Sequence, residues 1–231
     1  MSAARRTAKR PAPPAPFAVK DCALAAIATG RRAQNLRELH EGLLAADAAC
    51  LFYHFWGGLL RPAFDDPEYR NDFAAWAAHG LHDPRLAERL GVLDPAAFSD
   101  LDESRHAVLE IVEERLDESE MVPWAKGDRQ FHFLSAQIVV FRSGAVIEGP
   151  GKLPASVAEM SLGSIFYHFV DARRRNPDGR DDVALWLATL GPQYDDLQAN
   201  LAAAGRGFVT LGELRDRMTD VTHRRIGGPH P

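Results

Sequence analysis

The chain has 231 residues, 46% hydrophobic and 26% charged, with a formal net charge of −5, which is ordinary composition for a globular protein with a sizeable core. The acid excess argues against a nucleic-acid binder, and no apolar run approaches the ~18 residues of a membrane span, so we expect neither nucleic acid nor membrane as a partner. Two cysteines, Cys22 and Cys50, without metal-like spacing fit a reducing compartment, and we expect a cytoplasmic protein.

Residues 1–15 are rich in Ala, Pro and basic side chains, which predicts a disordered arm. The next segment, residues 17–27, is strand-like, and Thr29-Gly30 predicts a turn at its end because glycine adopts positive φ at little cost. Asn35 is expected to cap a helix, with Glu38 three residues on. The first quarter of the chain therefore predicts a strand, a turn and a helix.

Further helices are expected along the chain. Asp47 can open a helix that carries Phe52-Tyr53-His54-Phe55, and Asp72 lies at the start of the next. Residues 101–116 show helical spacing of apolar side chains. Residues 131–141 are the clearest strand, being rich in β-branched and aromatic side chains, and Ala145-Val146-Ile147 could complete a hairpin.

The Phe-Tyr-His-Phe tetrapeptide reveals an internal repeat, because it returns at residues 166–169 with an offset of 114. The same offset matches other positions, such as Phe17 with Phe131, Gly30 with Gly144 and Leu39 with Leu153. Beyond the tetrapeptide the offset falls to 110 and matches Asp72 with Asp182 and Trp76 with Trp186. Duplication explains these matches. We place copy 1 at 16–126, copy 2 at 127–226 and a tail at 227–231.

The order of elements predicts an α+β protein in which each copy is a β-hairpin followed by several helices. We expect the copies to share one antiparallel sheet and to be related by a pseudo-twofold axis. Two independent lobes are the alternative. The oligomeric state is left open by the sequence.

The pattern resembles a bacterial domain family of unknown function, number 5752 in its series. The segments that carry the resemblance are Ala28-Thr29-Gly30, Leu36-Arg37-Glu38-Leu39, Leu51-Phe52-Tyr53-His54 and the run from Asn71 to Trp76, with looser matches in copy 2. Cys50 and Arg180-Asp181 depart from the family pattern. The resemblance implies no reaction, cofactor or catalytic residue. Relatives lie near genes for trehalose and sucrose glycosyl transfer, which links the family to sugar metabolism as context only.

The histidines of the repeat, His54 and His168, are expected to be largely buried, and a buried imidazole needs partners for both nitrogens. One interpretation is structural: each histidine ties its helix to the start of the next through Asp72 or Asp182, which also suits the helix dipole. The aromatic residues that would pack around these centres, and that are candidates for ligand contact, are Tyr53, Trp76, Tyr167 and Trp186.

The alternative interpretation is catalytic. If the two centres met in one cleft, His54, Asp72, His168 and Asp182 could perform acid–base chemistry or bind a metal ion. However, the core lacks His at i and i+4 and lacks Glu-x-x-His, so we expect no metal site and no cofactor. The run Arg173-Arg174-Arg175 is either a solvated helix end or a contact for an anionic ligand.

The sequence therefore favours a non-enzymatic module that binds a partner protein or a small metabolite. The alternative is a hydrolase- or isomerase-like enzyme, with metal assistance as one variant, whose His/Asp site lies between the copies.

Overall fold

The computed structural model describes residues 15–61, 68–98, 100–118 and 122–226. The expected basic arm, apart from Ala15, and the tail at 227–231 lie outside these ranges. Where helices are described, none is long and apolar enough to cross a bilayer.

Two long strands, β1 (Phe17–Ala33) and β2 (Phe131–Ile147), pair antiparallel to form a two-stranded ribbon. The register sets Phe17 opposite Ile147 at one end and Ala33 opposite Phe131 at the other. The α+β class and the shared antiparallel sheet are therefore confirmed. Each strand is nonetheless a single run, where the sequence predicted a hairpin in each copy.

The predicted turns are bulges within these strands. Residues 29–31 of β1 face only residue 133 of β2, and residues 143–145 of β2 face only residue 19 of β1. Gly30 and Gly144 have φ of +80° and +83°, so the positive φ expected of these glycines is present. It occurs in a bulge and not in a turn, because both structures can require positive φ. Thr29 Oγ1 donates to the Phe133 carbonyl and Ser143 Oγ to the Val19 carbonyl, both at 2.7 Å. These bonds hold the bulge while the strand continues.

Helices follow each strand and form two lobes. Copy 1 supplies α1 (Leu36–Ala45), α2 (Ala48–Trp56), α3 (Asp72–His79), α4 (Pro84–Gly91) and α5 (Leu101–Asp117). Copy 2 supplies α6 (Leu153–Ala158), α7 (Leu162–Ile165), a π-helical segment (Phe166–Asp171), α8 (Ala172–Arg175), α9 (Asp182–Leu190), α10 (Asp195–Ala204) and α11 (Leu211–Ile226). Short 3₁₀ turns occur at Gly57–Leu60, Pro95–Ala97, Val122–Trp124, Pro150–Lys152 and Pro192–Tyr194.

Side-chain caps start the helices where the sequence indicated. Asn35 accepts from the Glu38 amide while Glu38 accepts from the Gln34 amide, which is a reciprocal capping arrangement. Asp47 caps α2 by accepting from the Cys50 amide. At α3 the cap is Asn71 and not Asp72, which leaves the Asp72 carboxylate available for other contacts.

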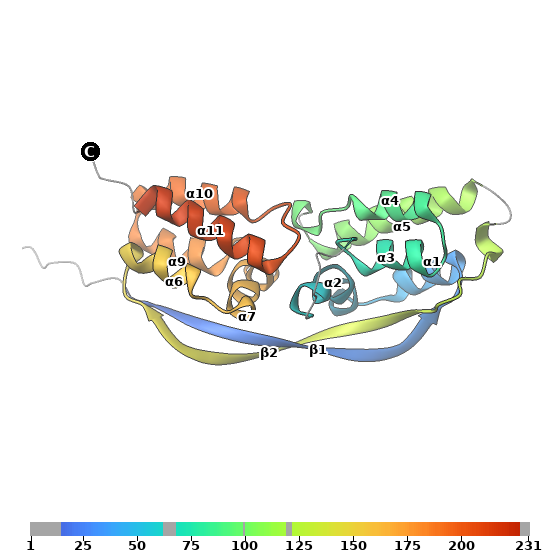
Figure 1. The fold of residues 1–231 in the computed structure, drawn as a ribbon, viewed down its shortest axis with the longest axis horizontal. Coiled ribbons are helices and arrows are strands. Elements are labelled where there is room, and N and C mark those ends of the chain that lie inside the picture. The colour runs from blue at the N-terminus through green and yellow to red at the C-terminus, as the bar shows by residue number, and fades with distance from the viewer. Residues whose placement is uncertain (1–14, 62–67, 99, 119–121, 227–231) are drawn as a thin grey trace, which may run out of the picture.

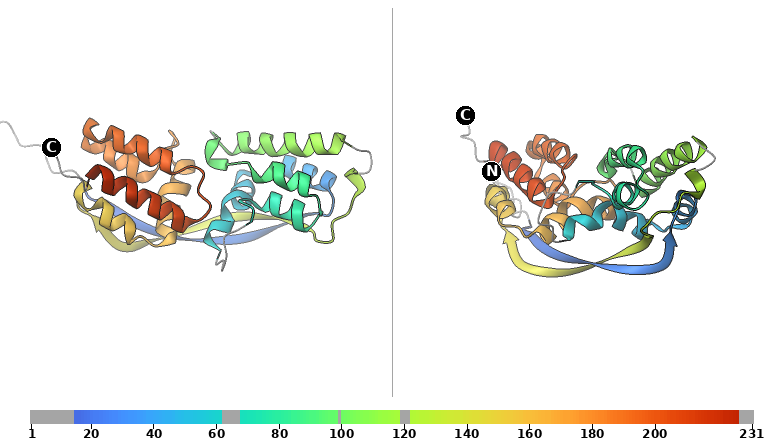
Figure 2. Two further views of the ribbon diagram at one scale, coloured as in Figure 1. Left: turned by 45° about the horizontal axis from the view of Figure 1, so that its top comes forward. Right: turned by 45° about the vertical axis from the view of Figure 1, so that its right-hand side comes forward.

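Both lobes lie on the same face of the ribbon, side by side (Figure 1). On the opposite face the two further views show no helix over the described part of the ribbon (Figure 2). The strand side chains of Ile27, Val139 and Phe141 are about half exposed. Each strand runs from one lobe to the other, so β1 begins beneath the copy 2 helices and ends beside α1 (Figure 1).

This crossing exchanges strand ends between the copies. Phe131 and Phe133, from copy 2, belong to the core of the first lobe together with α1–α5. Phe17 and Val19, from copy 1, belong to the core of the second lobe together with α6–α11. Neither lobe has a complete core without the other copy.

The exchange predicts that a mutation in one copy destabilises the lobe of the other. Phe17→Ala removes a buried ring from the second lobe and should cost about 3–5 kcal/mol. Hydrogen exchange followed by mass spectrometry should then accelerate in α6 and α9 before α1 and α3. Phe131→Ala is the matched variant and should give the reverse order. Faster exchange confined to the mutated copy's own helices would contradict the exchange of strands.

Candidate functional site

The histidine of the first lobe is buried and bonded on both ring nitrogens. His54 is 3% exposed and projects from α2 toward β2. Its Nδ1 lies 3.0 Å from an Asp72 carboxylate oxygen, and its Nε2 accepts from the Leu134 amide at 3.1 Å. Phe131 packs against the ring, with centroids 4.6 Å apart. The predicted contact with Asp72 is present. The sequence did not predict the hydrogen bond from the Leu134 amide, which belongs to the strand of the other copy.

The second lobe repeats this arrangement. His168 is 2% exposed, its Nδ1 lies 2.8 Å from Asp182, and its Nε2 accepts from the Lys20 amide at 2.9 Å. Phe17 packs against the ring at 4.9 Å. Residues 20 and 134 differ by the repeat offset of 114. Each histidine therefore accepts from the equivalent residue in the strand of the other copy.

The tryptophans complete the contact with the strand. Trp76 Nε1 donates to the Arg129 carbonyl at 2.7 Å, and Trp186 Nε1 donates to the Ala15 carbonyl at 2.9 Å. Each acceptor lies two residues before the strand that the histidine binds. We call the histidine, aspartate and tryptophan of each lobe the strand clasp.

In each lobe an arginine binds the aspartate of the strand clasp, and the sequence did not predict this contact. Arg61 donates to both Asp72 oxygens at 2.9 and 3.0 Å and lies over the Tyr53 ring. Arg175 occupies the equivalent position, 114 residues later. Copy 1 keeps only the third arginine of the copy 2 run, and the sequence predicted a solvated helix end or an anion contact for that run, not a contact with the aspartate.

Arg175 donates to Asp182 at 2.8 Å and lies 4.0 Å from the centroid of Tyr167. Burial opposes ionisation of Asp182, but hydrogen bonds from His168, Arg175 and Asn176 outweigh it and hold the pKa of that carboxyl below its ordinary value. The ionised carboxylate therefore orients the imidazole, with Nδ1–H as donor and Nε2 as acceptor.

This geometry bears directly on catalysis. A general base needs a nitrogen that can reach substrate, whereas both nitrogens of each imidazole already have protein partners. The two histidines also lie in separate cores and do not share a cleft. The four aromatic candidates make internal contacts: Tyr53 and Tyr167 with arginines, and Trp76 and Trp186 with backbone carbonyls.

The other reactive groups give no stronger centre. Cys22 and Cys50 are buried free thiols, and burial raises the pKa of Cys22 to about 12 and that of Cys50 to about 11, so neither is a thiolate at neutral pH. His79 and His82 form exposed ion pairs with Glu68 and Asp128. Over the described residues, no group of three or more His, Cys, Asp or Glu side chains is placed to hold a metal ion.

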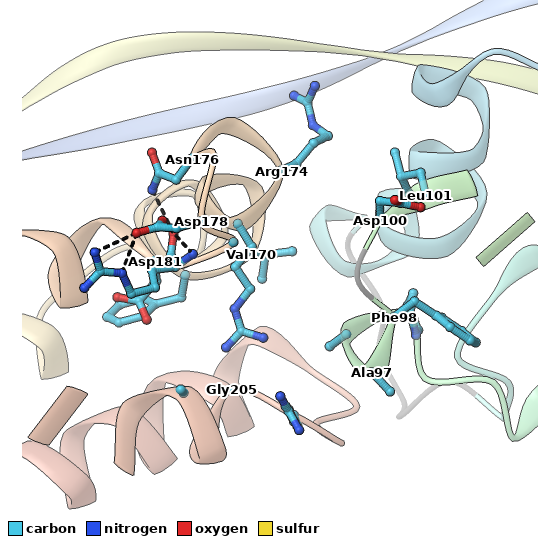
Figure 3. A pocket seen from close by; sticks show the side chains of 18 of the residues that line it. Ala97, Phe98, Asp100, Leu101, Val170, Arg174, Asn176, Asp178, Asp181 and Gly205 are labelled. Atoms are coloured by element: carbon cyan, nitrogen blue, oxygen red, sulfur yellow. Dashed lines mark hydrogen bonds and ion pairs between the residues drawn. The ribbon is translucent and has the colours of Figure 1, made fainter. Parts of the chain in front are cut away.

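A large cavity lies instead between the copies. We call it the inter-copy cleft, and its volume is about 1210 Å³. Copy 1 lines it with one face of α2 and with the segment that leads into α5. Copy 2 lines it with the π-helical segment, α8, the loop before α9, and α10. Figure 3 shows Phe98, Asp100 and Leu101 on one side and Val170, Asp181 and Gly205 on the other.

Aromatic rings and charged side chains both line this cleft. Trp56 of copy 1 stacks on Phe208 of copy 2, with centroids 6.1 Å apart and planes inclined by 20°. Arg174 lies 5.0 Å from the Phe52 centroid. Of the sequence candidates, only the arginine run contributes to this cleft, through Arg173 and Arg174. The cleft could not be found from the sequence, because its walls come from segments far apart in the chain.

Comparisons with known proteins agree with the fold. The model of a family described as of unknown function, DUF5752, matches residues 14–223. The structure of OrfY from Thermoproteus tenax is similar, with a TM-score of 0.80 and 28% sequence identity over 93% of this chain and 97% of that one. None of the curated proteins matches the chain.

The clasp predicts a stability cost for loss of its histidine. His54→Ala removes the partner of the Leu134 amide and one partner of Asp72 in a partly buried setting and should cost about 1–3 kcal/mol in urea unfolding. His79→Ala is the control, because that side chain is exposed and its ion pair with Glu68 should contribute less than about 1 kcal/mol. Equal stability of the two variants would exclude a structural role for His54.

Stability should also depend on pH through His54. Burial is the dominant effect and lowers the pKa of this imidazole below its ordinary value of 6.5, so the unfolded chain binds the proton more readily. The contribution of neutral His54 to the free energy of unfolding is complete above pH 6.5 and is lost as the pH falls through the lowered folded-state pKa. Urea midpoints from neutral to acidic pH should fall less steeply for His54→Gln. Parallel pH profiles for the two proteins would refute this assignment.

Proposed function

The chain belongs to the DUF5752 family of unknown function, and we propose that it is a non-enzymatic module that binds a small metabolite in the inter-copy cleft. The observation that carries this proposal is the cleft itself, a cavity of about 1210 Å³ with walls from both copies. Ligand sites are typically concave, of this order of size, and combine apolar walls with a few polar groups.

The composition of the cleft supports a small ligand over a protein surface. Phe52, Trp56 and Phe208 give it apolar walls, while Arg173 and Asn176 place polar groups among them. A partner protein would need a broad exposed surface with its own apolar centre, whereas these rings line a concave cavity.

The strand clasps favour binding over catalysis. The repeat retains His, Asp and Trp in both copies, and both sets are used to hold the strands. Their retention therefore has a structural explanation, and the main argument for an acid–base site between the copies loses its basis.

The family's context in sugar metabolism suggests which ligands to try first. Sugars and sugar phosphates are of suitable size, and aromatic side chains provide flat apolar faces for their rings. We therefore propose a metabolite of sugar metabolism as the ligand class.

A thermal-shift screen with a blocked cleft tests this function. Sugars, sugar phosphates and divalent metals are screened against the full chain, and a ligand present at 100 times its Kd should stabilise the protein by about 2.7 kcal/mol, or several degrees. Ala202→Trp fills the cleft from the exposed face of α10 and should abolish the shift.

Ala203→Trp is the matched control, because Ala203 is the next exposed residue of α10 but does not line the cleft. It should keep the ligand-induced shift. The proposal fails if no compound stabilises the native protein, or if both tryptophan variants respond as the native protein does.

A further inference from the structure

Arg173 stands out among the basic residues of the inter-copy cleft. Arg174 pairs with Asp171 at 2.8 Å, and Arg180 pairs with Asp178 at 2.6 Å. Arg173 is only partly exposed, yet its guanidinium makes no hydrogen bond or ion pair with any residue that the structure describes. A guanidinium has five N–H donors, and one without a protein partner can donate to an anionic ligand.

A second arginine lies close to it. Arg206 also lines the cleft, and its side chain is exposed. Burial lowers the pKa of the Arg173 guanidinium, the Asp181 carboxylate raises it, Arg206 lowers it and the Asp94 carboxylate raises it. Two cations in one cleft repel each other, and an anion bound between them would remove that repulsion.

The carboxylates nearby are engaged elsewhere. Asp181 caps α9 by accepting from the Ala184 amide at 2.7 Å. Asp94 accepts from the Ala96 and Gly207 amides, both at 3.0 Å. Both carboxylates accept from backbone amides, and in the part of the chain that the structure describes neither forms a hydrogen bond or ion pair with Arg173.

An apolar surface adjoins the two arginines. Phe208 follows Arg206 by two residues and stacks on Trp56, so one wall of the cleft is a pair of rings. A ligand that filled both parts would carry an anionic group and a ring or similar flat portion. Two guanidinium groups suit a phosphate better than a single carboxylate, because a phosphate offers more charge and more acceptor oxygens.

We infer that the inter-copy cleft binds a phosphorylated metabolite, with its phosphate held by Arg173 and Arg206 and its ring against Trp56 and Phe208. This inference rests on the proposed function and adds the chemical class of the ligand. It also explains why copy 1 has Leu59 at the position equivalent to Arg173: the cleft needs its cations on one wall only.

Gly205 offers a way to move Arg173 without removing its charge. A Cβ built on Gly205 would lie 2.1 Å from Nη2 of Arg173, so the guanidinium must shift in Gly205→Ala. The glycine has φ of −79°, which alanine also adopts, so the backbone should tolerate the change.

The experiment measures binding of defined probes to the full chain by isothermal titration calorimetry. Phenyl phosphate and glucose 6-phosphate carry the phosphate and a ring, and both should bind more tightly than inorganic phosphate. Phenol and glucose lack the anion, benzoate and glucuronate replace the phosphate by a carboxylate, and these four should bind more weakly.

Arg173→Gln should raise the Kd of the phosphate esters about tenfold or more, because it removes a charge-assisted contact. Gly205→Ala should weaken binding in the same direction with its net charge unchanged. Arg224→Gln is the control: it removes one positive charge from an exposed position on α11 outside the cleft and should leave Kd unchanged.

The inference is overturned if neither phosphate ester binds at millimolar concentration, if the neutral or carboxylate analogues bind equally well, or if Arg173→Gln binds as the native protein does. These results would leave the proposed function standing as long as Ala202→Trp abolishes the response to some other metabolite. If Ala202→Trp does not abolish the thermal shift of any metabolite, the cleft is not the binding site and the proposed function fails as well.

Discussion

In each lobe, a buried imidazole accepts a hydrogen bond from the backbone of a strand that belongs to the other repeat copy. The aspartate on Nδ1 orients the ring, and the tryptophan binds the chain just before the strand. A backbone N–H in an aromatic core must be satisfied, so the imidazole and the strand depend on each other. The fold is therefore held together by contacts between copies.

The cleft follows from this exchange. Because both strands run through both lobes, the lobes stand beside each other on one ribbon face (Figure 1). The residues that line the cavity come from both lobes. Repeat symmetry is kept at the clasps, where Arg61 and Arg175 are equivalent. It is lost at the cleft, where Arg173 replaces the leucine of copy 1. The shared part of the duplication serves stability, and the divergent part is available for recognition.

Local signals in the sequence predicted much of this structure. Asn35 and Asp47 start the helices expected of them, and His54 meets Asp72 as proposed. The Thr29-Gly30 signal was misassigned to a turn, because positive φ at glycine suits a bulge equally well. The stability of a continuous strand depends on a partner 114 residues away, which no local pattern encodes.

By itself, the sequence determined the duplication, the positions of most helices and the pairing of each histidine with the next helix, because these depend on residue type and short spacing. Only the tertiary structure decided that the copies exchange strands and that a cleft opens between them. The acceptor of each tryptophan and the donor to each histidine are backbone groups. Every residue but proline carries both groups, so residue identity cannot reveal which of them a side chain binds.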